Sequence, residues 1–196
     1  MKSLRYMLAV VLMSLSTVAF AQSDMHKMNE PKTPATKSEA QISFDTMKTL
    51  AGDWEGPVKT DMPVEANVDI KPVHLSMRVT SRGNVLVHEF QQAGTPLDPT
   101  KYDHPVTMLY VDSDGDRLTL VHYCDAGNRP RMTGKMSPDG KTLEFDFADL
   151  SGSNKYGHMY HAVFTVIDAN HHTEEWTYMM PGDKPVHAHI DLQRTN

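Results

Sequence analysis

The feature that most constrains this chain's fold is a series of strong turn signals, separated by short segments in which apolar and polar residues alternate. Alternation with a period of two is typical of β-strands that bury one face, and turn residues between such segments indicate hairpins. The predicted strands follow one another through hairpins and leave no room for crossover helices, which argues against parallel β-α-β units. The signals are Arg82-Gly83-Asn84, Asp114-Gly115, Pro138-Asp139-Gly140, Ser151-Gly152-Ser153, Asp168-Ala169-Asn170 and Pro181-Gly182-Asp183.

The alternating segments predict an all-β fold, an antiparallel up-and-down β-barrel of nine or ten strands with one short N-terminal helix. We expect a closed barrel because closure removes the exposed edges of a sheet. The helix is indicated by Phe44, Met47 and Leu50, which follow Ser43 as its N-cap at helical spacing. The strands are drawn from the ranges 53–59, 64–70, 73–80, 85–91, 105–111, 117–124, 130–136, 142–149, 157–167, 172–180 and 185–194, of which 64–70 is the weakest.

Two hairpins predict their own register, because only one pairing places all apolar residues on the same face. Around Pro138-Asp139-Gly140 the apolar pairs are Met136 with Leu143, Gly134 with Phe145, and Met132 with Phe147, while Lys135 faces Glu144 on the other side. At Arg82-Gly83 the apolar face holds Leu75, Met77, Val79, Leu86, His88 and Phe90. A third, at Asp114-Gly115, places Thr107, Leu109 and Val111 opposite His122, Leu120 and Leu118.

The N-terminus has the pattern of a secretory signal peptide. Residues 1–21 combine the basic Lys2 and Arg5, an apolar run, and a small-x-small cleavage site at Ala19-Phe20-Ala21. Residues 22–40 lack apolar periodicity and contain prolines and charges, which predicts a disordered linker. We therefore expect an exported protein without a membrane anchor, periplasmic or secreted, with its barrel domain at 41–196.

Charge and cysteine content exclude some classes of partner and site. The whole chain carries a net charge of −6, and removal of Lys2 and Arg5 with the signal peptide makes it −8. An acidic chain of this kind disfavours nucleic acid and anionic membranes as partners. Cys124 is the single cysteine, so it forms no disulfide within the chain. It ends a mostly apolar strand face, which favours a buried structural cysteine over a nucleophile.

Histidines near the C-terminus form the main candidate site. If the turns at Ala169-Asn170 and Gly182-Asp183 both have two residues, three rows of side chains cross the last three strands on one face. The rows are His161, Tyr178 and His187; Val163, Trp176 and His189; and Thr165, Glu174 and Asp191. The candidate ligand-binding residues are therefore His88, His161, Trp176, Tyr178, His187 and His189.

Two other interpretations of this face remain open. His161, His187, His189 and Glu174 offer donors that suit a divalent metal, or haem iron. Alternatively the face looks outward, and Val186, Ala188, Ile190 and Leu192 line the interior.

The remaining motifs give weaker indications of a functional site. Asp112 to Asp116 resembles the start of a calcium loop but lacks its glutamate, and neither HExxH nor GxSxG occurs, which counts modestly against hydrolase chemistry. The proline-rich segment 94–105 is either a lid over one mouth of the barrel or a plain connector.

The stretch Leu50-Ala51-Gly52-Asp53-Trp54-Glu55-Gly56 resembles the Gly-x-Trp entry of lipocalin-like barrels of the calycin superfamily. This resemblance implies that Trp54 closes one end of the barrel and that a basic residue of the last strand, here Arg194, packs on its ring. It assigns Gly52, Trp54 and Arg194 structural roles only. The stretches "LAGDWEG" and "VHYCDAGNRPRM" are similar to exported bacterial lipocalin-like proteins of no established activity.

These observations lead to three functional hypotheses. The first is an exported barrel without catalytic activity that binds a small hydrophobic or amphipathic molecule. The second is a metal- or haem-binding barrel that uses the histidine and glutamate face, haem being suggested by a distant similarity to nitrobindin-type barrels. The third is a structural or stress protein whose barrel is filled by its own side chains.

Overall fold

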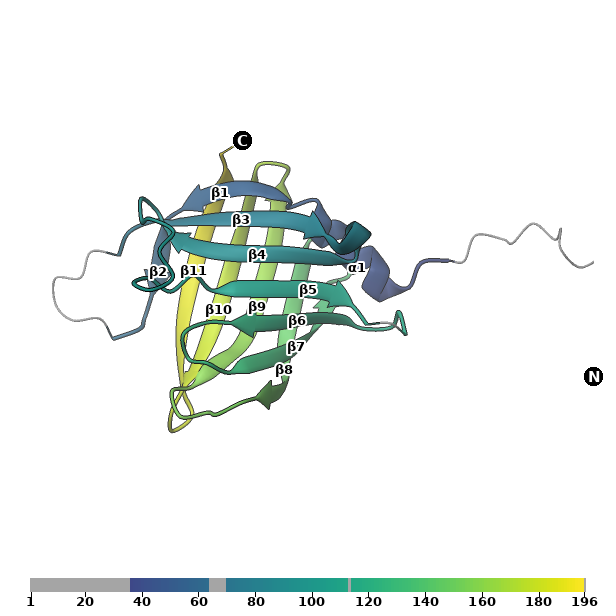
Figure 1. The fold of residues 1–196 in the computed structure, drawn as a ribbon. Coiled ribbons are helices and arrows are strands. Elements are labelled where there is room, and N and C mark those ends of the chain that lie inside the picture. The colour runs from purple at the N-terminus through teal and green to yellow at the C-terminus, as the bar shows by residue number, and fades with distance from the viewer. Residues whose placement is uncertain (1–35, 64–69, 113, 196) are drawn as a thin grey trace, which may run out of the picture. The chain divides into compact units, whose positions relative to one another are not determined.

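The fold is a β-barrel with a short helix at one end, described by a computed structural model for residues 36–63, 70–112 and 114–195 (Figure 1). Residues 37–196 form one compact unit. The predicted signal peptide (1–21), most of the predicted linker (22–40) and nearly all of the weak strand 64–70 lie outside the described residues. The elements are α1 (Glu39–Lys48), β1 (Gly52–Gly56), β2 (Val58–Thr60), β3 (Val73–Thr80), the 3-10 turn η1 (Ser81–Gly83), β4 (Val85–Gln92), β5 (Val106–Val111), β6 (Leu118–Tyr123), β7 (Arg129–Met136), β8 (Thr142–Ser151), β9 (His158–Asp168), β10 (His171–Met180) and β11 (Lys184–Arg194).

The barrel closes through the first and last strands. From β3 to β11 each strand pairs antiparallel with the next, and β1 pairs with β3 on one side and β11 on the other. After Pro57 the chain continues as β2, which also pairs with β11, so β1 and β2 share one strand position. The described strands thus form a closed antiparallel barrel of ten positions, which confirms the predicted fold class. Helix α1 is too short to cross a membrane, and no other described helix could.

Helix α1 begins earlier than the sequence pattern predicts. Its N-cap is Ser38, whose side chain accepts a hydrogen bond from the Gln41 backbone N–H at 3.2 Å. Ser43, the predicted cap, lies inside the helix, where its hydroxyl donates to the Glu39 carbonyl at 2.8 Å. The predicted cap is therefore wrong, because an apolar spacing locates the buried face of a helix but does not fix its first turn.

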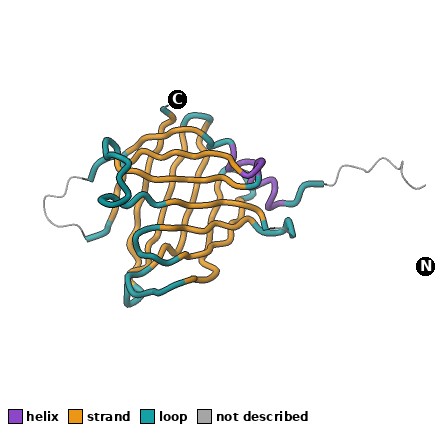
Figure 2. Tube along the Cα trace, in the orientation of Figure 1, coloured by secondary structure: helices purple, strands orange, loops and turns teal. Residues whose placement is uncertain are grey.

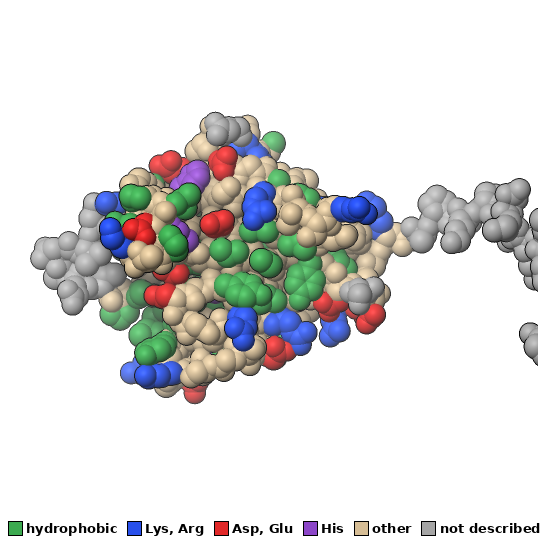
Figure 3. All heavy atoms as spheres, in the orientation of Figure 1, with side chains coloured by type: hydrophobic (Ala, Val, Ile, Leu, Met, Phe, Trp, Pro, Cys, Tyr) green, Lys and Arg blue, Asp and Glu red, His purple; other side chains and the backbone are tan. Residues whose placement is uncertain are grey.

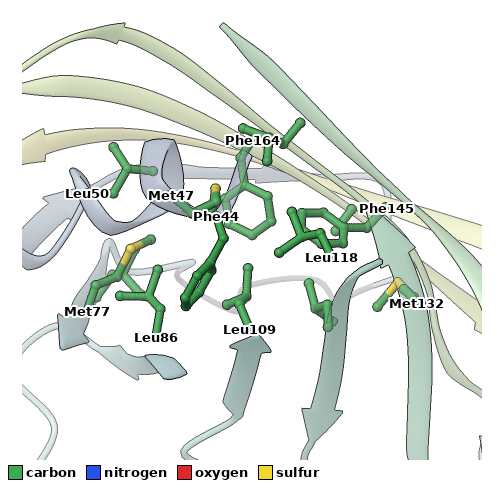
Figure 4. Close-up of a cluster of buried hydrophobic side chains, with 14 of the residues drawn as sticks. Phe44, Met47, Leu50, Met77, Leu86, Leu109, Leu118, Met132, Phe145 and Phe164 are labelled. Carbon is green, nitrogen blue, oxygen red and sulfur yellow. The ribbon is translucent and has the colours of Figure 1, made fainter. Parts of the chain in front are cut away.

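The core is densest where the helix meets the barrel (Figure 4). Phe44 and Met47 point from α1 into the barrel, and the helix packs against β5, β6 and β7. The fully buried side chains around them include Leu86, Leu109, Leu118, Met132, Phe145 and Phe164. Each buried aliphatic or aromatic side chain contributes about 1.5–3 kcal/mol to folding, so this end of the barrel is filled and firmly closed. Figure 2 shows longer loops at the opposite end.

The three predicted hairpin registers are confirmed. Met136 pairs with Leu143, Gly134 with Phe145, and Met132 with Phe147. At η1, Leu75 pairs with Phe90, Met77 with His88, and Val79 with Leu86. Between β5 and β6, Thr107 pairs with His122 and Leu109 with Leu120.

The outer face of β4, β5 and β6 is partly apolar. Figure 3 shows hydrophobic side chains gathered in the middle of this face. The register places Met108 between Val87 and Val121, and Met108 is 39% exposed. Such a patch is ordinary for a folded surface, because apolar atoms contribute much of it.

Trp54 and Arg194 form the contact implied by the lipocalin resemblance. The Arg194 guanidinium lies 4.1 Å from the centroid of the Trp54 ring. It also donates to the carbonyls of Thr49, Ala51 and Ala169 at 3.1, 2.8 and 2.9 Å, so it ties β11 to the end of the helix. Gly52 is needed beside it: its φ is +138°, and a Cβ there would lie 2.3 Å from Arg194 Nη1.

Replacing Arg194 by lysine should therefore destabilise the protein although the charge is kept. Lysine cannot form the planar fork that reaches three carbonyls, nor lie flat on the indole ring. We expect a loss of about 1.5 kcal/mol in the free energy of unfolding, measured by urea denaturation. The exposed Arg78 on the outer face of β3 provides the control, and Arg78→Lys should change stability by less than about 0.5 kcal/mol. Equal effects of the two variants would contradict this role of Arg194.

Candidate functional site

A buried polar cluster occupies the barrel interior. At its centre the Glu174 carboxylate of β10 accepts three hydrogen bonds: from His88 Nε2 at 3.0 Å, from His172 Nε2 at 3.1 Å and from Trp176 Nε1 at 2.9 Å. His88, His172 and Glu174 have no exposed surface, and Trp176 is 4% exposed. His172, Glu174 and Trp176 alternate along β10, so all three point inward.

The cluster holds Glu174 in its ionised form. Burial alone would raise the pKa of Glu174, but the charge interaction with His88 and the hydrogen bonds from His172 and His88 outweigh it, so the pKa lies at about 2. An ionised carboxylate only accepts hydrogen bonds, which places a proton on Nε2 of both histidines. The Nδ1 atoms of both histidines are buried and have no hydrogen-bond partner among the described residues.

A second pair extends the cluster across the barrel. His122 of β6 is 2% exposed, and its Nδ1 is hydrogen-bonded to the Thr107 hydroxyl at 2.9 Å. Burial, and to a smaller extent His88, lowers the pKa of His122 to about 4. The His88 and His122 rings lie 5.6 and 5.8 Å from the Trp176 ring, so both imidazoles are close to the same indole.

A recess opens at the end of the barrel opposite α1, and we call it the mouth recess. It has a volume of about 270 Å³. Its lining includes Val58, Val73, Phe90, Gln91, Asp103 and Ile190. The Phe90 ring meets the His88 ring edge-on at 4.5 Å and the Trp176 ring at 6.0 Å. The apolar recess and the polar cluster therefore share Phe90.

A separate groove lies on the outer face of the last strands, and we call it the outer groove. It has a volume of about 360 Å³ and is lined by residues that include Asp61, His161, Glu175, Thr177, His187 and His189. His187 Nδ1 is hydrogen-bonded to the Thr177 hydroxyl at 3.1 Å, and His189 Nδ1 lies 3.5 Å from Glu175 Oε1.

The predicted rows of side chains are wrong by one residue. Thr177, not Tyr178, pairs with both His161 and His187, and Glu175, not Trp176, pairs with Val163 and His189. One cause is the turn between β10 and β11, which has three residues because Met180 pairs with Lys184. The other is a bulge that leaves Ile167 unpaired between β9 and β10. An odd shift transfers a whole row to the other face.

This shift separates the predicted site residues into two groups. His161, His187 and His189 face outward around the outer groove, while His88, Glu174 and Trp176 face inward. The predicted metal set of His161, His187, His189 and Glu174 is therefore not assembled. Of the alternative interior residues Val186, Ala188, Ile190 and Leu192, three are buried, at 8%, 5% and 0% exposed for Val186, Ile190 and Leu192, while Ala188 is half-buried. Tyr178 lies near the loop end, where its hydroxyl donates to the Tyr156 carbonyl at 2.8 Å.

Sequence reasoning missed two members of the interior cluster. The residues predicted for the site do not include His172, and the sequence pattern places His122 only opposite Thr107 in a hairpin. The signal for the first is the alternation His172-x-Glu174-x-Trp176, which puts three polar groups on one strand face. The neighbouring strands have apolar inner faces. A polar face between them indicates side chains that hydrogen-bond to one another inside the barrel.

Cys124 follows β6 and is half-buried, beside a recess whose lining includes Asp103, His104 and Tyr123. Burial raises the pKa of its thiol, which keeps the sulfur protonated at neutral pH. His122, the nearest imidazole along the chain, is bonded to Thr107 instead. These observations agree with a structural cysteine.

Comparisons with known proteins show the fold and no family. No family model matches the chain, and no curated protein matches it. Among solved structures it is similar to that of Rv2717c from M. tuberculosis, with 12% identity and a TM-score of 0.55 over 79% of this chain and 98% of that chain. It also matches a protein of unknown function from the DUF3598 family of Nostoc punctiforme, with 13% identity and a TM-score of 0.40 over 76% of this chain. The match spans 48% of the Nostoc protein.

Proposed function

We propose that this barrel binds a small apolar or amphipathic molecule in the mouth recess and performs no chemistry on it. The observation that carries the proposal is an apolar recess over Phe90 at the loop end of a barrel whose other end is packed and closed. Ligand sites are typically concave and mostly apolar, with a few polar groups that fix orientation. Here Gln91 and Asp103 are the polar groups of the lining.

The size and support of the recess restrict the ligand. A volume of about 270 Å³ accommodates a small molecule or one segment of a longer one. Phe90 packs on His88, which the Glu174 hydrogen bonds hold in place, so the base of the recess is preorganised. Preorganised sites lose less conformational entropy on binding.

A charge placed in the recess should abolish binding of an apolar ligand. Val73, at the start of β3, lines the recess, so Val73→Arg should weaken binding of a neutral fluorescent probe such as N-phenyl-1-naphthylamine at least tenfold. The matched control is Val79→Arg, six residues along the same strand, where the side chain is 42% exposed. Fluorescence titration measures affinity, and circular dichroism checks that both variants are folded.

The outcomes of this experiment are distinct. Loss of binding in Val73→Arg alone supports the mouth recess as the site. Equal loss in both variants, or no saturable binding by the unmodified protein, would contradict the proposal and favour the barrel filled by its own side chains.

Gently purified protein provides an independent test. Native mass spectrometry should detect a co-purified molecule of low mass, and visible absorption should show no haem band. A haem band would instead favour the haem-binding hypothesis, for which the predicted donor set is not assembled.

Export and a lipocalin-like ancestry belong to the same proposal. The support for export is the signal-peptide pattern at 1–21, and the support for the calycin resemblance is the contact of Trp54 with Arg194 beside Gly52. Expression with the complete N-terminus should yield an exported protein whose measured mass is that of a chain beginning at Gln22. An unprocessed protein retained in the cytoplasm would contradict export.

A further inference from the structure

A histidine and two carboxylates converge on the outer surface of β8 and β9. Glu144 and Asp146 alternate on β8, and Asp146 pairs with His161 of β9. One ligand atom from each of the three residues lies within 4.8 Å of the others. Because all three side chains project from paired strands, the backbone fixes their spacing, and only side-chain rotation is needed to bring them together.

The imidazole is held between the two carboxylates. His161 Nδ1 lies 3.1 Å from Asp146 Oδ1, and His161 Nε2 lies 3.5 Å from Glu144 Oε1. The His161 side chain is only 25% exposed, whereas the carboxylates are 59% and 78% exposed. The ring is therefore mostly covered by its neighbours, and the carboxylates remain accessible to an ion from solvent.

The negative charge at this position has no permanent counter-charge. Among the described residues, neither Glu144 nor Asp146 has a lysine or arginine nitrogen within 4 Å, and His161 is the ionic partner of both. Lys135 faces Glu144 across the β7–β8 ladder but forms no ion pair with it. When His161 is neutral, two carboxylates stand side by side, an arrangement that a divalent cation would stabilise.

We propose that Glu144, Asp146 and His161 bind a divalent transition-metal ion of the zinc class, with water in the remaining positions. One nitrogen and two oxygens suit Zn²⁺, which often has three protein ligands and an open position. An imidazole ligand disfavours Ca²⁺ and Mg²⁺, which prefer oxygen donors alone. Since His161 also lines the outer groove, there is space for that water.

The geometry needs only a small adjustment. In a tetrahedral site, bonds of about 2.0–2.2 Å to a common ion place two ligand atoms roughly 3.3–3.6 Å apart. Side-chain rotations that move the ligand atoms by about 1–1.5 Å relative to one another therefore bring the present limit of 4.8 Å to that separation. His187 and His189 do not belong to this group of donors, and their Nδ1 atoms face Thr177 and Glu175 instead.

The test is calorimetric titration of the purified protein with Zn²⁺, with the number of bound ions counted by native mass spectrometry. His161→Ala should remove one equivalent of bound Zn²⁺ or lower the affinity for that ion at least tenfold. His187→Ala and His189→Ala are the matched controls on the same outer face and should leave that equivalent unchanged. The double substitution Glu144→Gln with Asp146→Asn tests the carboxylates while His161 stays intact, and it should have the same effect as His161→Ala.

Three results would overturn the proposal. The first is a His161→Ala variant that binds Zn²⁺ with the same stoichiometry and affinity as the unmodified protein. The second is an equal loss of bound Zn²⁺ in the His187→Ala or His189→Ala variant, which would indicate that the ion binds in the outer groove instead. The third is Ca²⁺ or Mg²⁺ binding as tightly as Zn²⁺, which would exclude a role for the imidazole. Because all variants lie on the surface, unchanged thermal unfolding without metal verifies that they are folded.

Discussion

Replacing Glu174 by alanine is expected to lower the free energy of unfolding by about 4 kcal/mol, the largest effect of any single substitution considered for this protein. The substitution removes the common acceptor of His88, His172 and Trp176. Three buried N–H groups then lack a partner, and each such group costs about 1–3 kcal/mol. Urea denaturation at neutral pH measures the loss, which is a large part of the 5–15 kcal/mol typical of a domain.

The adjacent residue provides a matched control. Glu175 lies on the outer face of the same strand, and its side chain is 64% exposed. Glu175→Ala should change stability by less than about 0.5 kcal/mol. Glu174→Gln should fall between the two, because its carbonyl still accepts hydrogen bonds while its NH₂ group faces other donors. If Glu174→Ala were as stable as Glu175→Ala, the cluster would not be the organising element of the interior.

The cluster also connects the closed end of the barrel to the mouth through a chain of contacts. His172 meets the Trp54 ring edge-on at 4.2 Å, near the Arg194 contact, and His88 meets Phe90 at the recess. Glu174 joins the two histidines. Its loss should therefore weaken probe binding at the mouth as well as stability.

The sequence predicts the N-terminal and central hairpins well and the C-terminal ones poorly, for a physical reason. Around Pro138-Asp139-Gly140 one register alone buries Met136, Gly134 and Met132 opposite apolar partners. Such a one-sided pattern specifies its own pairing.

The last three strands carry polar residues on both faces, so their pattern does not select a register. Inward His172 and Glu174 look as polar as outward His171 and Glu175. Only the bulge at Ile167 and the three-residue turn decide between the faces, and neither has a unique local signature. The sequence therefore identifies His88, Glu174 and Trp176 as candidate residues, but it does not predict that they assemble with His172 inside the barrel.

Acid should destabilise this protein through His122 in particular. The folded state protonates His122 only near pH 4, whereas the unfolded chain protonates it near its ordinary pKa of 6.5. Between these values the unfolded state binds more protons, so stability is complete above about pH 6.5 and is lost as the pH falls toward 4. Linkage gives a loss of about 2–3 kcal/mol between pH 7 and pH 4.5 from this residue alone.

Substituting His122 by glutamine should remove this part of the acid sensitivity. Glutamine keeps a polar group near the Thr107 hydroxyl but does not titrate. We expect the stability difference between pH 7 and pH 4.5, measured by urea denaturation, to be about 2–3 kcal/mol smaller in His122→Gln than in the unmodified protein. Glu174 responds at lower pH, because its pKa of about 2 lies below its ordinary value of 4.5, and its stabilisation is lost as the pH falls through that interval. An identical pH dependence of the two proteins above pH 4.5 would mean that His122 is protonated within the fold, and that the interior is less dry than its burial implies.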